Sequence, residues 1–271
     1  MSDGLVDRLR VNPGDPARLL ERDPRDRLGI AGKREGEEHI AGLVDELRDL
    51  QSRLWAEDTR AVLLVLQGLD TSGKDSTIRR VFSGVNPLGC SVASFKPPNE
   101  QELDHDFLWR VHAVCPERGQ IGIFNRSHYE DVATVRVKQL VGEEAWRRRY
   151  RHIREFERLL TDEGTTVVKV FLQISKEEQR ERLQERLDDP TKTWKFRLDD
   201  LEDRGHWDEF LAAYEDALTE TSTEWAPWYV VPADRKWVRD IAVATLLVET
   251  LRRLDPQYPP PPEDLAGVVV E

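Results

Sequence analysis

The chain has 271 residues, a hydrophobic fraction of 39% and a formal net charge of −12. This length predicts about one or two domains, and the apolar content suffices for a core without disulfide or metal staples. With only two cysteines, the sequence excludes a disulfide scaffold and a cysteine-rich zinc site and favours a reducing cytoplasm. The acidic balance argues against a general nucleic-acid binder and leaves a locally basic groove open. The apolar runs are far shorter than the roughly 18 residues of a membrane span, and the first residues lack a secretory signal.

The elements follow one another in an alternating order. Residues 1–36 are rich in Pro, Gly and Arg-Asp pairs and predict an extended N-terminal arm, and residues 37–55 have the apolar spacing of an amphipathic helix. Continuous apolar segments followed by helical patterns predict strands of a parallel sheet covered on both faces, and hence a three-layer α/β domain over residues 37–255. Residues 256–271 predict a Pro-rich tail. The five predicted strands are residues 61–67, 91–95, 121–124, 166–174 and 228–231.

A phosphate-binding loop follows the first of these strands. Residues 68–77 have the spacing G-x-x-x-x-G-K, with a strand before them and a helix after them. Glycines allow backbone N–H groups to converge on phosphate oxygens, the helix start adds its positive end, and the lysine adds a point charge. A Gly-containing turn with a solvated lysine is the alternative. The loop residues expected to bind phosphate are Gly68, Thr71, Ser72, Gly73, Lys74, Asp75 and Ser76.

Two acids make this loop unusual. Asp75 stands where Ser or Thr usually follows the lysine, and Asp70 lies inside the loop. A carboxylate beside bound phosphate is repelled unless a cation lies between them, so we interpret Asp70 as a direct or water-mediated Mg²⁺ ligand. The alternative for Asp70 is a turn residue that bonds its own backbone.

The end of the third predicted strand is the second candidate phosphate element, because ligands collect at the carboxyl ends of parallel strands. Asn125 stands where a Walker B Asp is expected, and Arg126 is placed beside the transferring phosphate. Glu130 and Asp131 follow within about one helical turn and could supply the missing negative charge. They could equally be ordinary acids at the start of a helix, where the macrodipole favours them.

Together these segments resemble the polyphosphate kinase type 2 family. The resemblance extends over about residues 10–255 and implies a P-loop kinase-like fold. It also implies phosphoryl transfer between inorganic polyphosphate and nucleotides with Mg²⁺, for which Mn²⁺ can substitute. The residues that carry it are 12–16, 54–57, 68–77, 83–87, 94–96, 106–112, 124–132, 188–196, 226–228 and 230–234.

Two positions distinguish branches of that family. The branch that acts on nucleoside diphosphates has Asp at the position of Asn125 and Asn at that of Glu130. This sequence departs from both and is similar to the branch that phosphorylates AMP as well as ADP. The resemblance therefore implies a wider acceptor range, with Asn125 and Glu130 near the acceptor, and leaves open whether Glu130 or Asp131 touches metal.

A basic stretch over about residues 180–206 occupies the place of the lid in nucleotide and nucleoside kinases. A cationic lid closes over the phosphates, excludes water and stabilises transition-state charge. We assign Arg186 to the transferring phosphate and Lys192 to phosphate binding, and Trp194 is expected to stack on a base or pack the closed lid. A plain exposed loop is the alternative. The other arginine-rich stretch, residues 147–158, predicts a solvated helix face.

The resulting prediction is a phosphotransferase with a three-layer P-loop kinase-like fold, a five-stranded parallel sheet and a helical lid. Polyphosphate donates to AMP or ADP, or to guanine counterparts, while Lys74, Arg126 and Arg186 hold phosphate oxygens and Asp70, with Glu130 or Asp131, holds Mg²⁺. We expect a homo-oligomer, a dimer or a tetramer, in the cytoplasm. The alternatives are an ATP-dependent nucleoside or nucleotide kinase of the same fold and a non-catalytic polyphosphate- or nucleotide-binding module.

Overall fold

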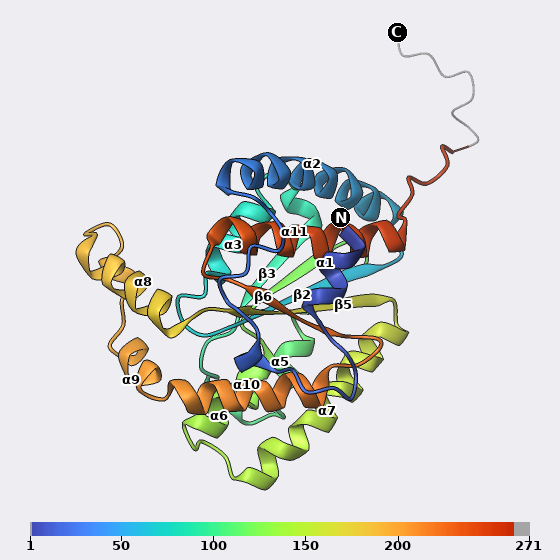
Figure 1. Cartoon of the computed structure of the whole chain (residues 1–271). Coiled ribbons are helices and arrows are strands. Elements are labelled where there is room, and N and C mark those ends of the chain that lie inside the picture. The colour runs from blue at the N-terminus through green and yellow to red at the C-terminus, as the bar shows by residue number, and fades with distance from the viewer. Residues whose placement is uncertain (1, 263–271) are drawn as a thin grey trace.

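A six-stranded sheet forms the middle layer of the chain in the computed structural model, which describes residues 2–262 (Figure 1). The strand order is β1-β6-β5-β2-β4-β3, in which β2 to β6 are parallel and β1 pairs antiparallel with β6. The five expected parallel strands are therefore present. The strands are β1 (Arg10–Val11), β2 (Ala61–Gln67), β3 (Cys90–Ser94), β4 (Ile121–Asn125), β5 (Thr165–Gln173) and β6 (Trp228–Pro232).

Helices cover both faces of this sheet. In Figure 1, α2 and α11 lie above it and α6, α7 and α10 lie below it. The helices are α1 (Ser2–Leu9), α2 (Lys33–Glu57), α3 (Lys74–Val81), α4 (Glu100–Leu103), α5 (Trp109–His112), α6 (Thr134–Val137), α7 (Glu143–Asp162), α8 (Lys176–Asp188), α9 (Asp199–Gly205), α10 (Trp207–Thr221) and α11 (Lys236–Leu254). Short 3₁₀ helices are η1 (Leu19–Glu21), η2 (Pro87–Gly89), η3 (His128–Asp131) and η4 (Thr193–Lys195).

The central strand β2 shows why three layers form. All seven of its residues are buried, and they alternate between two separate cores. Leu63 and Val65 join the core under α7 and α10, whereas Leu64 and Leu66 join the core under α2 and α11. A strand that is apolar on both faces requires a covering layer on each side, which confirms the predicted three-layer α/β class.

The N-terminal segment differs from the extended arm that its composition predicts. Its first residues form α1, and the two residues of β1 add an antiparallel edge strand to β6. Leu9 is buried in the core under α11, and Leu5 and Val6 pack against that core. The physical reason for the difference is tertiary, because the open edge of β6 and an unfilled apolar surface recruit a segment with weak local preference.

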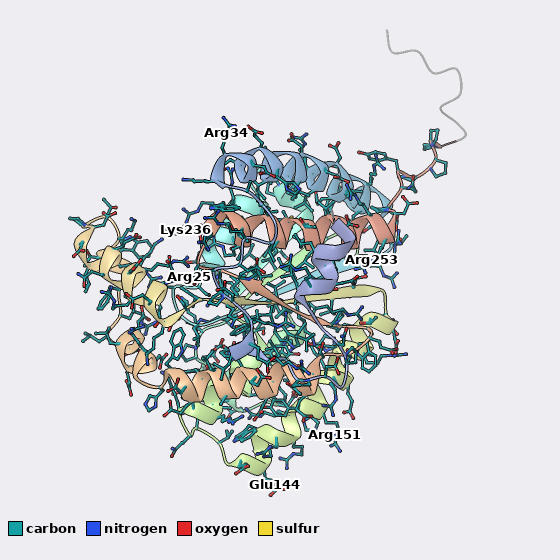
Figure 2. The ribbon with its side chains drawn as sticks, in the orientation of Figure 1. Arg25, Arg34, Glu144, Arg151, Lys236 and Arg253 are labelled. Atoms are coloured by element: carbon teal, nitrogen blue, oxygen red, sulfur yellow. The ribbon has the colours of Figure 1, made fainter. Side chains whose placement is uncertain are left out.

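The C-terminal end of the described chain follows α11. Residues 255–262 have no regular secondary structure, in line with the Pro-rich tail, and the rest of that predicted tail lies outside the described residues. Within residues 2–262, no helix is long and apolar enough to cross a membrane. Charged side chains cover the outer faces of the helical layers, where Arg34 on α2 and Glu144 and Arg151 on α7 point outward (Figure 2).

Candidate functional site

The phosphate loop connects β2 to α3 and needs glycine at two positions. Gly68 and Gly73 have φ angles of 146° and 104°. A Cβ at Gly73 would lie 1.8 Å from Nη1 of Arg239, and one at Gly68 would lie 2.6 Å from the carbonyl oxygen of Leu172. Both the backbone conformation and the packing therefore exclude a side chain. The loop ends at Lys74, where α3 begins and presents its N-terminal N–H groups to the same space.

Lys74 lies on the inner side of this loop. Its Nζ donates to the carbonyl oxygens of Gly68 at 2.7 Å and Leu69 at 3.3 Å, and only 8% of the residue is exposed. Burial, together with the nearby positive charge of Arg126, lowers the pKa of Lys74 to about 8. The ammonium is thus held back against the backbone, within reach of an anion that enters the loop.

Two hydroxyl groups of the loop are unpartnered within residues 2–262, and one of them, on Thr71, belongs to a residue that lines the cavity described below. Thr71 Oγ1 and Ser72 Oγ are buried and have no hydrogen-bond partner among the described residues. Thr71 has a φ of 63°, a left-handed backbone conformation that is uncommon outside glycine. Ser76 Oγ bonds instead to the carbonyl oxygen of Gly73 at 2.9 Å. Unpartnered buried donors beside a positive helix end fit a phosphate group.

Arg126 connects the two predicted metal-binding acids. Its guanidinium lies 2.5 Å from Asp70 Oδ1 and 3.3 Å from Glu130 Oε2. Burial opposes ionisation of Asp70, but the charges of Arg126, Lys74 and Arg186 outweigh it and lower the pKa of this carboxyl. The pKa of Arg126 is raised, chiefly by Glu130 and Asp70. The structure therefore brings Asp70, Arg126 and Glu130 together as the sequence predicts, with both acids placed around one cation.

The donor atoms present fit a magnesium ion that is also held by phosphate. Glu130 Oε2 accepts from Thr134 Oγ1 at 2.6 Å, whereas Glu130 Oε1 is buried without a partner among the described residues. Within residues 2–262, no group of three or more His, Cys, Asp and Glu residues could hold a metal ion by itself. Mg²⁺ is typically bound by one or two carboxylates plus substrate phosphates and water, and the carboxylates of Asp70 and Glu130 match that number and type of protein ligand.

Asp131 lies apart from these residues. Its carboxylate is 3.4 Å from Arg110 and 3.7 Å from Arg149, and burial raises the pKa of its carboxyl despite these two charges. Neither Asp131 nor Glu130 lines the cavity described below, so the two acids differ in their arginine partners. Of the two acids that the sequence leaves open, the structure therefore brings only Glu130 to Arg126.

Asn125 at the end of β4 faces the acid that replaces the usual loop hydroxyl. Its Nδ2 donates to Asp75 Oδ1 at 2.6 Å. The pairing of β4 with β2 places Asn125 beside Leu66, directly before the phosphate loop. The negative charge expected at the end of β4 is thus carried by Asp75 on α3 instead. The amide group of Asn125 orients that carboxylate.

A cavity of about 610 Å³ lies in front of the loop. Eleven of its described lining residues are Lys or Arg and four are Asp or Glu, in a chain whose net charge is −12. The predicted site residues that line it are Asp70, Thr71, Gly73, Lys74, Asp75, Ser76, Asn125, Arg126, Arg186, Lys192 and Trp194. The other lining cations are Arg182, Lys195 and Arg197, which belong to the predicted lid stretch, and Arg79, Lys96, Lys236 and Arg239, which no sequence motif assigned to the site.

Two of these additional arginines support the loop from behind. Arg182 on α8 donates to the carbonyl oxygens of Thr71 at 2.9 Å and Ala233 at 2.7 Å, and Arg239 lies 3.4 Å from that of Ser72. Both side chains are almost fully buried, and Asp240 pairs with Arg239 at 2.7 Å. Because the contacts with the loop join residues 111 and 167 positions apart in the chain, no local sequence pattern indicates them.

The predicted lid is helical and lies at one side of the layers, where α8, η4 and α9 extend outward (Figure 1). Arg186 Nη1 is 3.2 Å from Asp200 Oδ2, and Lys192 Nζ is 2.9 Å from Asp189 Oδ2. Trp194 is 77% exposed yet lines the cavity. An exposed tryptophan beside cations leaves a flat apolar surface at the cavity mouth.

The comparisons with known proteins agree with this geometry. The profile of the Polyphosphate kinase 2 (PPK2) family matches residues 31–259. An AMP/ADP-polyphosphate phosphotransferase of Meiothermus ruber is 56% identical over 97% of this chain and 99% of its own length, and an ADP-polyphosphate phosphotransferase of Rhodopseudomonas palustris is 47% identical over 83% of each. The crystal structure of Polyphosphate Kinase 2 from Arthrobacter aurescens TC1 superposes with a TM-score of 0.93 at 42% identity, covering 97% of this chain and 94% of its own. A loop, a basic cavity and a fold of this kind, shared over almost the whole length, identify the chain as a member of the polyphosphate kinase 2 family.

Proposed function

We propose that the chain transfers the terminal phosphoryl group of inorganic polyphosphate to AMP and to ADP. The observation that carries this proposal is the cavity in front of the phosphate loop, where cations outnumber acids in an otherwise acidic protein. A chain of phosphates needs many cations over an extended surface. The relatives named for AMP/ADP- and ADP-polyphosphate phosphotransfer support the same substrates.

The chemistry requires positioning and charge neutralisation, because phosphoryl transfer passes through a loose transition state. Lys74, Arg126 and Arg186 hold the oxygens of the transferring group. Magnesium, with Mn²⁺ as a substitute, would be held by Asp70 and Glu130 and would supply positive charge to the phosphates. The hydroxyl groups of the loop and the start of α3 orient the phosphate, and no covalent phosphoenzyme is needed.

The direct test mixes ADP, polyphosphate and Mg²⁺ and measures ATP, and then repeats the assay with AMP and measures ADP. The proposal expects product from both acceptors. Activity that requires ATP as donor would favour an ordinary nucleotide kinase of this fold, and binding without turnover would favour a non-catalytic module.

Acceptor range is the second part of the proposal, and Glu130 is the residue that tests it. AMP is shorter than ADP by one phosphoryl group, so one site must accommodate two positions of the acceptor's terminal phosphate. A carboxylate at position 130, with one oxygen unpartnered, can attract a second Mg²⁺ or an ordered water, whereas an amide attracts metal weakly. We expect Glu130→Asn to lose more kcat/KM for AMP than for ADP.

The control for this measurement is Glu144→Asn, which removes a carboxylate from an exposed position on α7 (Figure 2). It should leave both acceptors unchanged. Equal losses on AMP and ADP in Glu130→Asn would identify Glu130 as a general metal ligand. An absence of AMP activity in the wild type would overturn the assignment of this branch.

The remaining expectations stay predictions of the sequence: a homo-oligomer (dimer or tetramer), a cytoplasmic location and no nucleic-acid binding. Size-exclusion chromatography with light scattering tests the first of them directly.

A further inference from the structure

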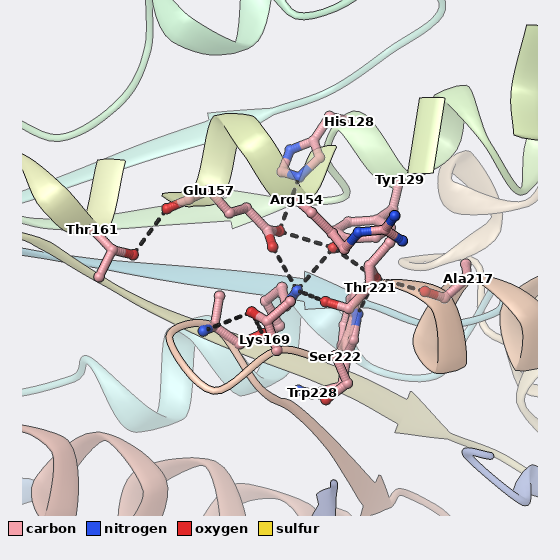
Figure 3. A network of polar contacts seen from close by, with 12 residues as sticks. His128, Tyr129, Arg154, Glu157, Thr161, Lys169, Ala217, Thr221, Ser222 and Trp228 are labelled. Atoms are coloured by element: carbon pink, nitrogen blue, oxygen red, sulfur yellow. Dashed lines mark hydrogen bonds and ion pairs between the residues drawn. The ribbon is translucent and has the colours of Figure 1, made fainter. Parts of the chain in front are cut away.

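A buried ion pair lies beneath the segment that carries the site acids. Lys169 in the middle of β5 and Glu157 on α7 are both 0% exposed, and Lys169 Nζ lies 2.6 Å from Glu157 Oε2 (Figure 3). Lys169 also donates to the carbonyl oxygen of Thr221 at 2.7 Å. Burial alone would raise the pKa of Glu157, but the neighbouring charge of Lys169 outweighs it and keeps the carboxylate ionised.

The other oxygen of Glu157 holds η3. Glu157 Oε1 accepts from the hydroxyl of Tyr129 at 2.8 Å and lies 3.3 Å from His128 Nε2 (Figure 3). Lys169 Nζ lies 3.0 Å from the same Tyr129 hydroxyl. The first two residues of η3 are thus attached to a sheet strand and to a helix at once, in an interior where hydrogen bonds to charges are strong.

These two residues, His128 and Tyr129, lie between Arg126, which contacts Asp70 of the phosphate loop, and Glu130, which contacts Arg126. Glu130 follows Tyr129 directly, and Arg126 and Glu130 are joined at 3.3 Å. Arg126 has a φ of 62°, which is strained for a residue with a side chain. Such strain persists only where the surrounding structure determines it. On the far side, Arg149 donates to the carbonyl oxygen of Asp131 at 2.8 Å and holds the end of η3.

We propose that the Lys169–Glu157 pair, acting through Tyr129, is a positioning network that sets Arg126 and Glu130 for phosphoryl transfer. Neither member of the pair lines the cavity, so both act through η3 and touch no substrate. The proposal rests on the proposed function for the identity of the reaction. It assigns a role to Glu157, which the sequence places in an arginine-rich helix face and the structure buries.

A buried network can also serve stability alone, and the two roles separate when both charges are removed together. Removing one partner leaves an uncompensated buried charge, whereas replacing both with uncharged residues of similar volume often preserves the fold. Glu157→Gln with Lys169→Met therefore retains the packing while it removes the ionic hold on Tyr129. Tyr129→Phe removes the shared hydroxyl and leaves both charges in place.

The experiment measures kcat and KM for AMP and ADP, together with the melting temperature, in the double variant, in Tyr129→Phe and in Leu47→Ala. Leu47 is fully buried on α2 in the opposite layer, so its variant loses stability without touching η3. Supporting groups around a site typically contribute about 10- to 100-fold in activity, so we expect kcat to fall by that factor in the first two variants. KM for the nucleotides should change little, and Leu47→Ala should keep its kcat below its melting temperature.

Two results would overturn the network's role. One is a wild-type kcat in a folded Tyr129→Phe and a folded double variant. The other is a loss of kcat that Leu47→Ala matches at equal stability. If the double variant does not fold, the kcat of Tyr129→Phe alone tests the role of the network. If the wild type used ATP and not polyphosphate as donor, the proposed function would fail. The kcat values of the same variants, measured with ATP as donor, would then still test whether the network positions Arg126 and Glu130.

Discussion

Lys74 is the residue on which the phosphate loop depends, and its environment makes its role measurable. The ammonium is nearly buried and bonds only backbone carbonyl oxygens of its own loop. Replacing it with alanine removes a transition-state charge contact without opening the main cores. We expect Lys74→Ala to lose about a hundred- to a thousandfold in rate while it keeps its fold.

The control for this change is Lys33→Ala at the exposed start of α2, which should behave as wild type. Rates under saturating substrate, together with circular dichroism, make the comparison. A folded Lys74→Ala variant within about threefold of the wild-type rate would refute the assignment of the loop.

Lys74 also predicts a pH dependence. Its pKa is about 8, so the ammonium deprotonates as the pH rises through that value and attracts phosphate less. The pH profile of kcat/KM reports ionisations of the free enzyme, so kcat/KM for polyphosphate should fall above about pH 8. Because the unfolded chain binds this proton more tightly, the same group should increase the free energy of unfolding between pH 8 and 10.5.

Lys74→Arg tests this prediction, because a guanidinium stays charged throughout the range. The fall of kcat/KM near pH 8 should disappear in that variant. Persistence of the same fall would assign it to another group.

Asp70 and Asp131 form a matched pair for the metal site. Both are mostly buried acids that pair with arginine, but only Asp70 lines the cavity. We expect Asp70→Asn to lower activity steeply, with partial recovery at high Mg²⁺, because the substitution is nearly isosteric and removes one hard anionic ligand. Asp131→Asn should leave the Mg²⁺ dependence unchanged.

Titration of activity against Mg²⁺ in the two variants makes this measurement. An unchanged Mg²⁺ dependence in Asp70→Asn would demote Asp70 to a turn residue. A shifted dependence in Asp131→Asn would restore Asp131 as a metal-binding candidate.

Among the elements, α8 and α9 extend outward from the three layers (Figure 1). Trp194 in η4 is 77% exposed and has one side-chain hydrogen bond, to the carbonyl oxygen of Thr191. If the segment from α8 to α9 closes over phosphate as a lid, this indole enters a drier environment. We expect a blue shift of tryptophan emission when polyphosphate and Mg²⁺ are added.

Trp194→Phe is the control that isolates this signal from the other seven tryptophans. The shift should be absent in that variant. A shift of equal size in wild type and Trp194→Phe would show that the signal arises elsewhere and would favour an exposed loop over a lid.

The positions of most elements follow from local patterns. The five predicted strands agree with β2 to β6 to within one residue at each end, because buried parallel strands are continuous apolar runs. The helix expected over residues 37–55 begins earlier, at Lys33, where Gly36 N–H donates to the carbonyl oxygen of Gly32 in a first turn that apolar periodicity does not reveal. α1 and β1 were missed because their stability comes from packing on β6 and α11.

On the scale of the whole molecule, charge is distributed unevenly. The chain has 52 acids and 40 bases, yet cations predominate around the cavity. The local excess of Lys and Arg gives the cavity a positive potential that attracts phosphate groups, whereas the net charge of the chain is negative. Overall composition therefore does not reveal this local charge.

The sequence by itself determined the phosphate loop, the five parallel strands and the family. These follow from short spacings: the turn, the lysine and the start of α3 lie within ten residues, and backbone geometry dictates their types. Only the tertiary structure decided what surrounds them. Arg182 reaches Thr71 across 111 residues, and Glu130, and not Asp131, meets Arg126. Such contacts depend on which helix faces cover which sheet face, and no local spacing encodes that.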